Sequence, residues 1–230
     1  MTDIYCDIAD IKLIRKFNKK KIVKGFTTNP SLMAKAGAKN YKKYSQKILR
    51  STSKPVSCEV FADNENEMIV QGKLINKWAN NVYVKVPIFN SKGKFMGKVI
   101  STLNKKNIKI NITAVYSVEQ VKRILKVLDK KTKVIISIFA GRMGDVGKDP
   151  LPIFKESLKL TKKFKNVKIL WASTREPYNY TQARDLKCDI ITCPPSIIEK
   201  IEKFGKTFTD LTVDTVKGFL EDSKRSKFKI

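Results

Sequence analysis

Eight short apolar runs recur along this chain at intervals of roughly 20 to 35 residues, and a longer amphipathic stretch follows each one. Near-continuous apolar strands that alternate with helices are typical of parallel sheets covered on both faces. Eight such units favour closure of the sheet into a barrel. The pattern therefore predicts an α/β fold, a single (βα)8 TIM barrel with parallel strands. The runs are residues 4–7, 22–28, 56–60, 82–86, 108–113, 133–139, 167–173 and 189–192.

Residues that typically start or end helices lie between these apolar runs. Asp10 is placed to cap a helix over residues 11–18, and Asn29 with Pro30 to start one that Gly37 ends. Ser117 precedes a further apolar stripe with helical spacing. A last amphipathic helix is expected around residues 211–220, followed by a basic tail, about 222–230, that is expected to fray. No linker divides the chain, so we expect residues 1–230 to form one domain.

The charge of the chain first suggests nucleic acid as a partner. The chain has 48 basic and 21 acidic residues, a formal net charge of +27, and basic proteins gain affinity by releasing counterions from phosphate. Only seven of the basic residues are arginine, the usual reader of bases. The lysines are spread through every helix-like segment instead of forming one patch. We expect no specific nucleic-acid partner, and a basic nucleic-acid-binding barrel remains a remote alternative.

The residue types that the chain lacks limit the catalytic mechanisms that it can use. The chain has no histidine, which excludes Ser-His and Cys-His pairs. The four cysteines lack the spacing of metal ligands, so we expect free thiols and no metal site. No run of eighteen apolar residues occurs and the first residues are too polar for a secretory signal, so a cytoplasmic protein is expected. Any catalysis must use carboxylate, lysine, hydroxyl or arginine groups.

The carboxyl ends of the predicted strands carry more polar groups than packing requires. Active sites of such barrels lie at that face. Lys85 lies within the apolar run 82–86, where loss of water would favour the neutral amine that can attack a ketone and form a Schiff base. A strand-end lysine that reaches solvent is the alternative. The polar residues at these ends are Asp7, Thr27, Asn29, Glu59, Lys85, Asn111, Thr113, Ser137, Arg142, Ser173, Arg175 and Thr192.

Two carboxylates and two arginines of this set have alternative explanations. Asp7 and Glu59 would supply the proton shuttle that a Schiff-base enzyme without histidine needs. A cap or an ion pair with a nearby lysine would also explain them, as helix capping would explain Asn29. Arg142 and Arg175 follow the sixth and seventh runs, where these barrels commonly bind phosphate. Solvated loop arginines are the alternative.

Five sequence blocks resemble the transaldolase family in the same order. Residues 25–32, Gly-Phe-Thr-Thr-Asn-Pro-Ser-Leu, look like the family signature after the second strand. Residues 84–87, Val-Lys-Val-Pro, resemble the segment that carries the Schiff-base lysine. The other blocks are residues 111–113, 137–142 and 171–175, so the resemblance covers nearly the whole chain. It implies an enzyme of the pentose phosphate pathway that acts on phosphorylated sugars without metal or organic cofactor, and we expect a homo-oligomer.

The resemblance also implies a role for each matching residue. Lys85 would form the Schiff base and Asp7 would be the acid–base group for carbon–carbon cleavage. Glu59 and Thr113 would hold a water that carries protons to and from Lys85. The remaining residues would bind substrate: Asn29, Asn111 and Ser137 would hold the hydroxyls of the dihydroxyacetone portion, Arg142, Ser173 and Arg175 would bind the phosphate, and Thr27 would also contact the substrate.

The branch within the family depends on a few positions. Fructose 6-phosphate aldolases resemble the chain in length but carry glutamine at position 59 and lysine at position 175, so Glu59 and Arg175, with Ser137, favour a transaldolase. Ile138 stands where the family commonly has proline, and the stretch after Pro87 is longer than usual. An aldolase that releases dihydroxyacetone, or an activity on another phosphorylated or sulfonated ketose, therefore remains an alternative.

Overall fold

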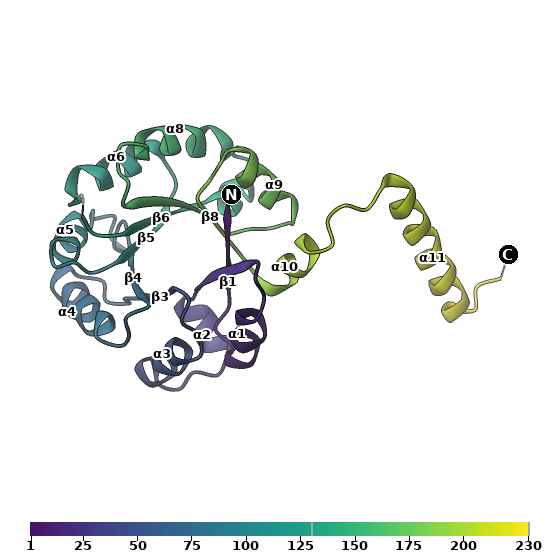
Figure 1. Ribbon diagram of the computed structural model, residues 1–230, viewed down its shortest axis with the longest axis horizontal. Helices are drawn as coiled ribbons and strands as arrows, with labels where there is room; N and C mark the ends of the chain where they lie inside the picture. Colours follow the sequence, from purple (N-terminus) through teal and green to yellow (C-terminus); the bar gives the residue numbers. More distant parts are fainter. Residues whose placement is uncertain (130, 230) are drawn as a thin grey trace.

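A computed structural model describes residues 1–129 and 131–229 of the chain. Eight parallel strands follow one another in chain order and close into a barrel, and helices surround it (Figure 1). The predicted (βα)8 barrel is confirmed. The strands are β1 (Asp3–Asp7), β2 (Val23–Thr27), β3 (Val56–Glu59), β4 (Val82–Pro87), β5 (Ile110–Val115), β6 (Val134–Phe139), β7 (Val167–Ala172) and β8 (Ile190–Cys193).

Several helices begin at the cap residues that the sequence indicates. Asp10 accepts a hydrogen bond from the Leu13 backbone nitrogen at 2.8 Å, and Ser117 forms a reciprocal capping box with Gln120. Asn29 caps the helix that starts at Pro30, as predicted. The helices are α1 (Ile11–Asn18), α2 (Pro30–Lys35), α3 (Tyr41–Arg50), α4 (Glu65–Asn76), α5 (Gly97–Lys105), α6 (Val118–Val127), α7 (Ala140–Gly144), α8 (Leu151–Thr161), α9 (Tyr178–Asp185), α10 (Pro195–Ile201) and α11 (Phe208–Ser226).

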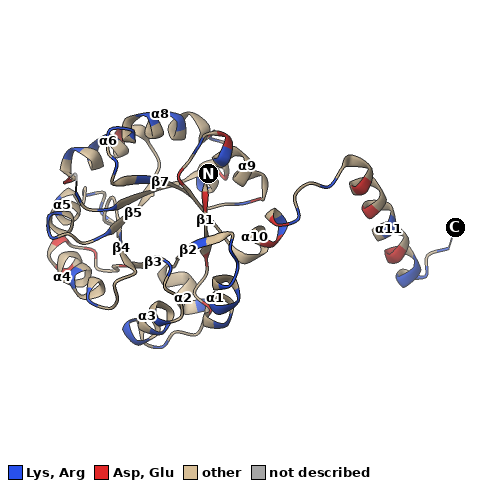
Figure 2. Ribbon diagram, viewed as in Figure 1, with Lys and Arg blue, Asp and Glu red and all other residues tan. Residues whose placement is uncertain are grey.

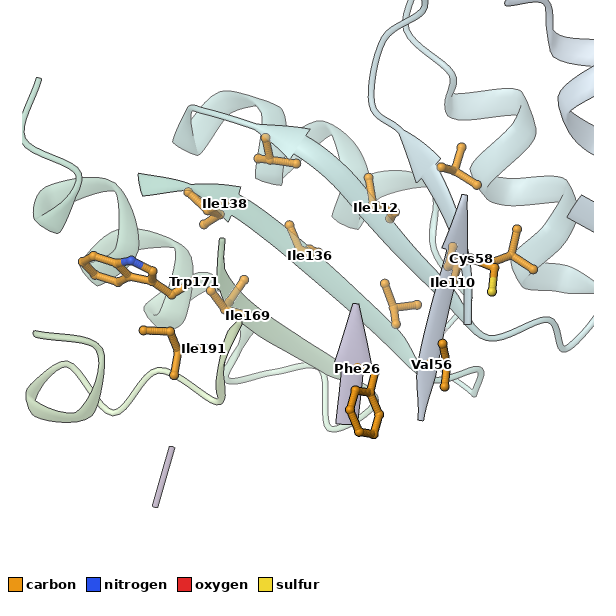
Figure 3. Packing of buried hydrophobic residues seen from close by; sticks show 14 of the residues in the cluster. Phe26, Val56, Cys58, Ile110, Ile112, Ile136, Ile138, Ile169, Trp171 and Ile191 are labelled. Carbon is orange, nitrogen blue, oxygen red and sulfur yellow. The ribbon is translucent and has the colours of Figure 1, made fainter. Parts of the chain in front are cut away.

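The strands separate two packing layers because successive side chains of a strand point to opposite faces. The outward-facing layer packs under the helices and includes Phe26, Ile112, Ile136 and Trp171 (Figure 3). A smaller apolar cluster lies inside the barrel and consists of Tyr5, Ile135, Leu170, Ala172 and Ile190, with Tyr83 and Phe139 against it. This interior cluster forms an apolar floor inside the barrel, and Leu170, Ala172 and Phe139 of it also line the cavity described below.

The four cysteines are free and buried. Within residues 1–129 and 131–229, no group of three or more His, Cys, Asp or Glu side chains is arranged to hold a metal ion. No helix in this described part of the chain has the length and apolar character that a membrane span requires.

Helix α11 stands apart from the barrel. It follows α10 after a short connection and projects away from the ring of helices (Figure 1). All of its residues are described and none is buried. The predicted amphipathic helix is present, and it continues to Ser226, within the segment 222–230 that the sequence predicts as a tail.

Gly141 allows a close approach between α7 and the loop after β7. A Cβ built on Gly141 would lie 1.7 Å from the carbonyl oxygen of Ser173, so no other residue fits without a backbone shift. Ser173 itself has a φ of 64°, in the left-handed region that few non-glycine residues adopt. The contact therefore holds the two segments that follow β6 and β7 against each other.

Replacing Gly141 by Ala should lower the free energy of unfolding by about 2 to 3 kcal/mol, because the added methyl group meets a backbone carbonyl that cannot rotate away. The measurement is the urea midpoint of the variant. Gly144→Ala is the matched control, since nothing lies within 4 Å of a Cβ at that helical position. Equal midpoints for the two variants would contradict this account of the contact.

Candidate active site

The barrel register aligns three of the predicted site residues. Glu59 of β3 pairs with Lys85 of β4, and Lys85 pairs with Asn111 of β5. On the opposite side, Asp7 of β1 pairs with Thr27 of β2. Because these positions follow the inward-facing floor residues by an even number, their side chains point into the barrel. The register thus gathers groups from five separate sequence segments at one end of the barrel.

A cavity of about 210 Å³ opens above the apolar floor. All of the predicted site residues except Glu59 line it, and Glu59 lines the adjoining hollow together with Lys85 and Thr113. Thr192, which the sequence analysis placed at a strand end without a role, also lines the cavity. The lining residues are Asp7, Thr27, Asn29, Lys85, Asn111, Thr113, Ser137, Phe139, Arg142, Leu170, Ala172, Ser173, Arg175 and Thr192.

Among the residues that the structure describes, Lys85 is the only lysine on the walls of this cavity. It is 7% exposed, so its side chain does not extend into bulk solvent from the strand end. Its Nζ lies 3.2 Å from Glu59 Oε2 and donates a hydrogen bond to the Thr28 carbonyl at 3.1 Å. The ion pair that offered an alternative explanation for Glu59 is therefore present, and its lysine is Lys85 itself.

Asp7 occupies the opposite wall of the cavity. Burial raises the pKa of its carboxyl group, and the nearby Lys85 and a hydrogen bond from Thr27 Oγ1 at 2.7 Å counteract part of that rise. Thr27 Oγ1 also lies 2.6 Å from Thr192 Oγ1. A carboxyl group with a raised pKa, held in place by a hydroxyl relay, is suited to accept and return a proton.

A buried polar chain runs across the inner face of three strands. Ser137 Oγ donates to Asn111 Oδ1 at 2.7 Å, and Asn111 Nδ2 donates to Ser57 Oγ at 3.0 Å. These bonds fix which face of the Asn111 amide meets the cavity. Thr113 Oγ1 is buried and has no hydrogen-bond partner among the described residues. A buried hydroxyl without a partner is expected to bind a water or a ligand group.

The two arginines at the cavity rim differ in their surroundings. Arg142, on α7, lies with its guanidinium 5.4 Å from the ring centroid of Phe139. Arg175 is held by Asp145: its Nε donates to Asp145 Oδ1 at 3.0 Å and its terminal nitrogen contacts Oδ2. This pair lowers the pKa of Asp145 and raises that of Arg175. Because Asp145 occupies one edge of the guanidinium fork, the other edge remains for an anion.

Sequence reasoning did not identify Asp145, Ser57 or Tyr41 as neighbours of the site. Asp145 lies three residues after Arg142 at the end of α7, a spacing that would have indicated a shared helix face. Ser57 precedes Glu59 by two residues and therefore shares its inward face. No local signal marks Tyr41, whose hydroxyl accepts from the Glu59 backbone nitrogen and donates to its carbonyl oxygen, both at 2.8 Å.

Known proteins resemble this chain along nearly its whole length. The profile of the family described as Transaldolase/Fructose-6-phosphate aldolase matches residues 4–230. A "Probable transaldolase" of Nitrosopumilus maritimus is 31% identical over 226 residues, 97% of this chain and 96% of that protein. Another, of Dehalococcoides mccartyi, is 34% identical over 197 residues, 85% of this chain and 88% of that protein.

A solved structure shares the fold without close sequence relationship. A dihydrodipicolinate synthase family protein from Coccidioides immitis superposes with a TM-score of 0.61 at 9% identity, covering 92% of this chain and 75% of that one. This likeness bears on the barrel architecture alone.

The raised pKa of the Asp7 carboxyl group predicts that this residue lowers the free energy of unfolding near neutral pH. A group whose folded pKa lies above its unfolded value contributes stability that is present below the unfolded pKa and lost as pH rises through the folded pKa. At pH 7 Asp7 therefore contributes less stability than it does below its unfolded pKa, and Asp7→Asn should raise the free energy of unfolding. The gain should shrink as pH falls through the raised pKa of folded Asp7, and it should be absent below about 4, the unfolded value.

Urea unfolding at a series of pH values measures the effect. Glu156→Gln is the control, because Glu156 is an exposed acid on α8 and its replacement should change stability little at any pH. A variant Asp7→Asn that is less stable than the wild type at pH 7 would contradict the burial argument.

Proposed function

Because the chain belongs to the transaldolase/fructose-6-phosphate aldolase family, we propose that it transfers a dihydroxyacetone unit between phosphorylated sugars through a Schiff base on Lys85. The observation that carries this proposal is a buried lysine amine paired with Glu59, in a polar cavity that is also lined by Asp7 and by two arginines. The same family description includes aldolases, so release of the three-carbon unit is the second candidate. We expect the reaction to take place in the cytoplasm.

The first step is formation of the imine. The neutral amine of Lys85 attacks the ketone carbon of the substrate, and loss of water from the carbinolamine leaves the Schiff base. Glu59, 3.2 Å from the amine, is placed to take the proton that the ammonium releases and to return it to the departing hydroxyl through a water. The partnerless hydroxyl of Thr113 is a suitable second ligand for that water.

The second step is cleavage of the carbon–carbon bond. The Asp7 carboxylate removes the proton of the substrate hydroxyl next to the bond that breaks, and the electrons move into the imine to give an enamine. Asn29, Asn111 and Ser137 line the cavity as hydrogen-bonding groups for the hydroxyls of the three-carbon unit. The raised pKa of Asp7 suits this role, since a stronger base takes the proton more readily.

The phosphate of the sugar would bind between the late loops. Arg142 and Arg175 supply two positive charges at the rim of the cavity. Ser173, which lies between them in the sequence, supplies a hydroxyl group, and its backbone packs closely against Gly141. The Asp145 carboxylate fixes the direction of the Arg175 fork. An arginine fork with one open edge is well matched to phosphate oxygens.

Borohydride reduction in the presence of a ketose phosphate tests the imine. Fructose 6-phosphate should add one substrate-derived mass to the protein, and peptide mapping should localise it to Lys85, because this is the lysine that lines the cavity. Lys85→Ala should abolish the addition. Label on another lysine, or trapping that survives in Lys85→Ala, would remove the basis of the proposal.

Glu59 should decide between transfer and release. The enamine left on Lys85 either attacks an acceptor aldehyde or is protonated and hydrolysed. A carboxylate at position 59 orders and exchanges protons with the water, whereas an amide cannot exchange protons at neutral pH. We expect the wild type to favour transfer when an acceptor is present, and Glu59→Gln to shift the ratio toward release severalfold while Lys85 trapping persists.

The measurement is the ratio of transferred product to free dihydroxyacetone at a fixed acceptor concentration. If the wild type already releases most of its three-carbon unit, the aldolase alternative takes the place of the transferase. An unchanged ratio in Glu59→Gln would show that Glu59 does not control this partition.

A further inference from the structure

The pairing of β2 with β3 stops at Thr27 and Ser57, two residues before β3 ends at Glu59. The Thr28 nitrogen then donates to the Ser57 carbonyl oxygen at 3.2 Å. Bonds between parallel strands recur at regular intervals, every second residue along each strand. The next two bonds of this series would join the Glu59 nitrogen to the Thr28 carbonyl oxygen, and the nitrogen of residue 30 to the Glu59 carbonyl oxygen.

The sequence after Thr28 prevents this continuation. Residue 30 is proline, which has no N–H to donate, and it is the first residue of α2, where the chain leaves the sheet. The Thr28 carbonyl oxygen accepts a hydrogen bond from Lys85 Nζ at 3.1 Å instead. The backbone nitrogen and carbonyl oxygen of Glu59 therefore need another partner, because a buried backbone group without one is costly.

The hydroxyl of Tyr41 is that partner. It accepts from the Glu59 backbone nitrogen and donates to the Glu59 carbonyl oxygen, both at 2.8 Å. One hydroxyl can do both, since it has a proton to donate and lone pairs that accept. Burial raises the pKa of the Tyr41 hydroxyl, so the group keeps its proton at neutral pH. A single side chain thus replaces the missing strand at Glu59.

Helix α3 sets the position of this hydroxyl. Tyr41 is its first residue, and Ser45 and Ile48, four and seven residues later, are buried on the same side. The four basic residues of α3, blue in Figure 2, are exposed. The Tyr41 ring packs edge-on against Phe61 at 5.3 Å and lies 6.1 Å from Trp78. The ring is therefore held by packing, and its hydroxyl is delivered to Glu59 in a defined direction.

We propose that Tyr41 is a positioning residue of the candidate active site. Its hydroxyl satisfies the backbone of Glu59 and thereby leaves the Thr28 carbonyl oxygen free to hold the amine of Lys85. Tyr41 is not among the described residues that line the two hollows beside Lys85, so it acts through its neighbours and does not touch substrate. This inference rests on the proposed function, because it concerns the reactive amine.

Loss of the hydroxyl would redirect one of the two groups that hold Lys85. The amine lies 3.2 Å from Glu59 Oε2 and 3.1 Å from the Thr28 carbonyl oxygen, and together these contacts set its direction. Without Tyr41 Oη, the acceptor in register with the Glu59 nitrogen is the Thr28 carbonyl. A bond to β3 turns that carbonyl along the sheet and weakens its contact with Lys85 in the barrel interior.

Tyr41→Phe tests the proposal, because it removes the hydroxyl and keeps the ring. We expect borohydride trapping at saturating fructose 6-phosphate to slow severalfold, while the substrate concentration that gives half-maximal trapping stays unchanged. Tyr44→Phe is the matched control on the same helix, since the Tyr44 hydroxyl donates to the Ala36 carbonyl oxygen at 3.3 Å, and it should trap at the wild-type rate. Wild-type trapping in Tyr41→Phe would overturn the proposal.

The pH profile of trapping separates positioning from a loss of folded protein. A smaller folded fraction lowers the rate by one factor at every pH. A weakened bond from Lys85 to the Thr28 carbonyl disfavours the ammonium form, so the rate of Tyr41→Phe should reach half its maximum at lower pH than that of the wild type. The charged groups around the amine, Glu59, Asp7, Arg142 and Arg175, are the same in both proteins. An unmoved midpoint would contradict the role assigned to Tyr41.

Hydrogen exchange of the wild type, resolved to single amides, gives a check that does not depend on the folding of a variant. The Glu59 amide should be protected although β2 has already ended beside it. Exchange as fast as in an exposed loop would overturn the contact with Tyr41. Failure of the wild type to be trapped would count against the proposed function, whereas the hold of Tyr41 on Glu59 is decided by the exchange measurement.

Discussion

The register of the closed barrel is the constraint on which the candidate site depends. Parallel strands bonded in chain order bring every carboxyl end to the same rim, and the pairings of Glu59 with Lys85 and of Lys85 with Asn111 set those three side chains in one row. Because side chains alternate between faces, a slip by one residue would turn Lys85 toward the helices and bring its apolar neighbour into the cavity. The outward isoleucines and valines that seal the helix layer thus also fix the inward orientation of the polar groups.

The interior of the barrel has an apolar part and a part that carries the charged groups of the candidate site. Tyr5, Leu170 and Ile190 belong to an apolar cluster inside the barrel, and Leu170 is also part of the cavity wall. Lys85 is buried but paired with Glu59, and a buried charge is tolerated when it has a partner. Asp7 is the exception, since burial works against its charged form. The large apolar core offsets this local cost, as is common where a protein keeps a group poised for proton transfer.

The sequence predicted the fold and the residues that line the site, but not the contacts among those residues, and the difference has a physical reason. Strand runs, caps such as Asp10 and the strand-end groups follow from patterns within a few residues, so the barrel and the lining of its cavity could be predicted. The contacts of Arg175 with Asp145 and of Tyr41 with Glu59 join segments about 30 and 18 residues apart. They depend on loop conformations such as the left-handed backbone of Ser173, for which a serine gives no sequence signal. The sequence also predicted the last helix, but its amphipathic pattern does not tell which surface it covers.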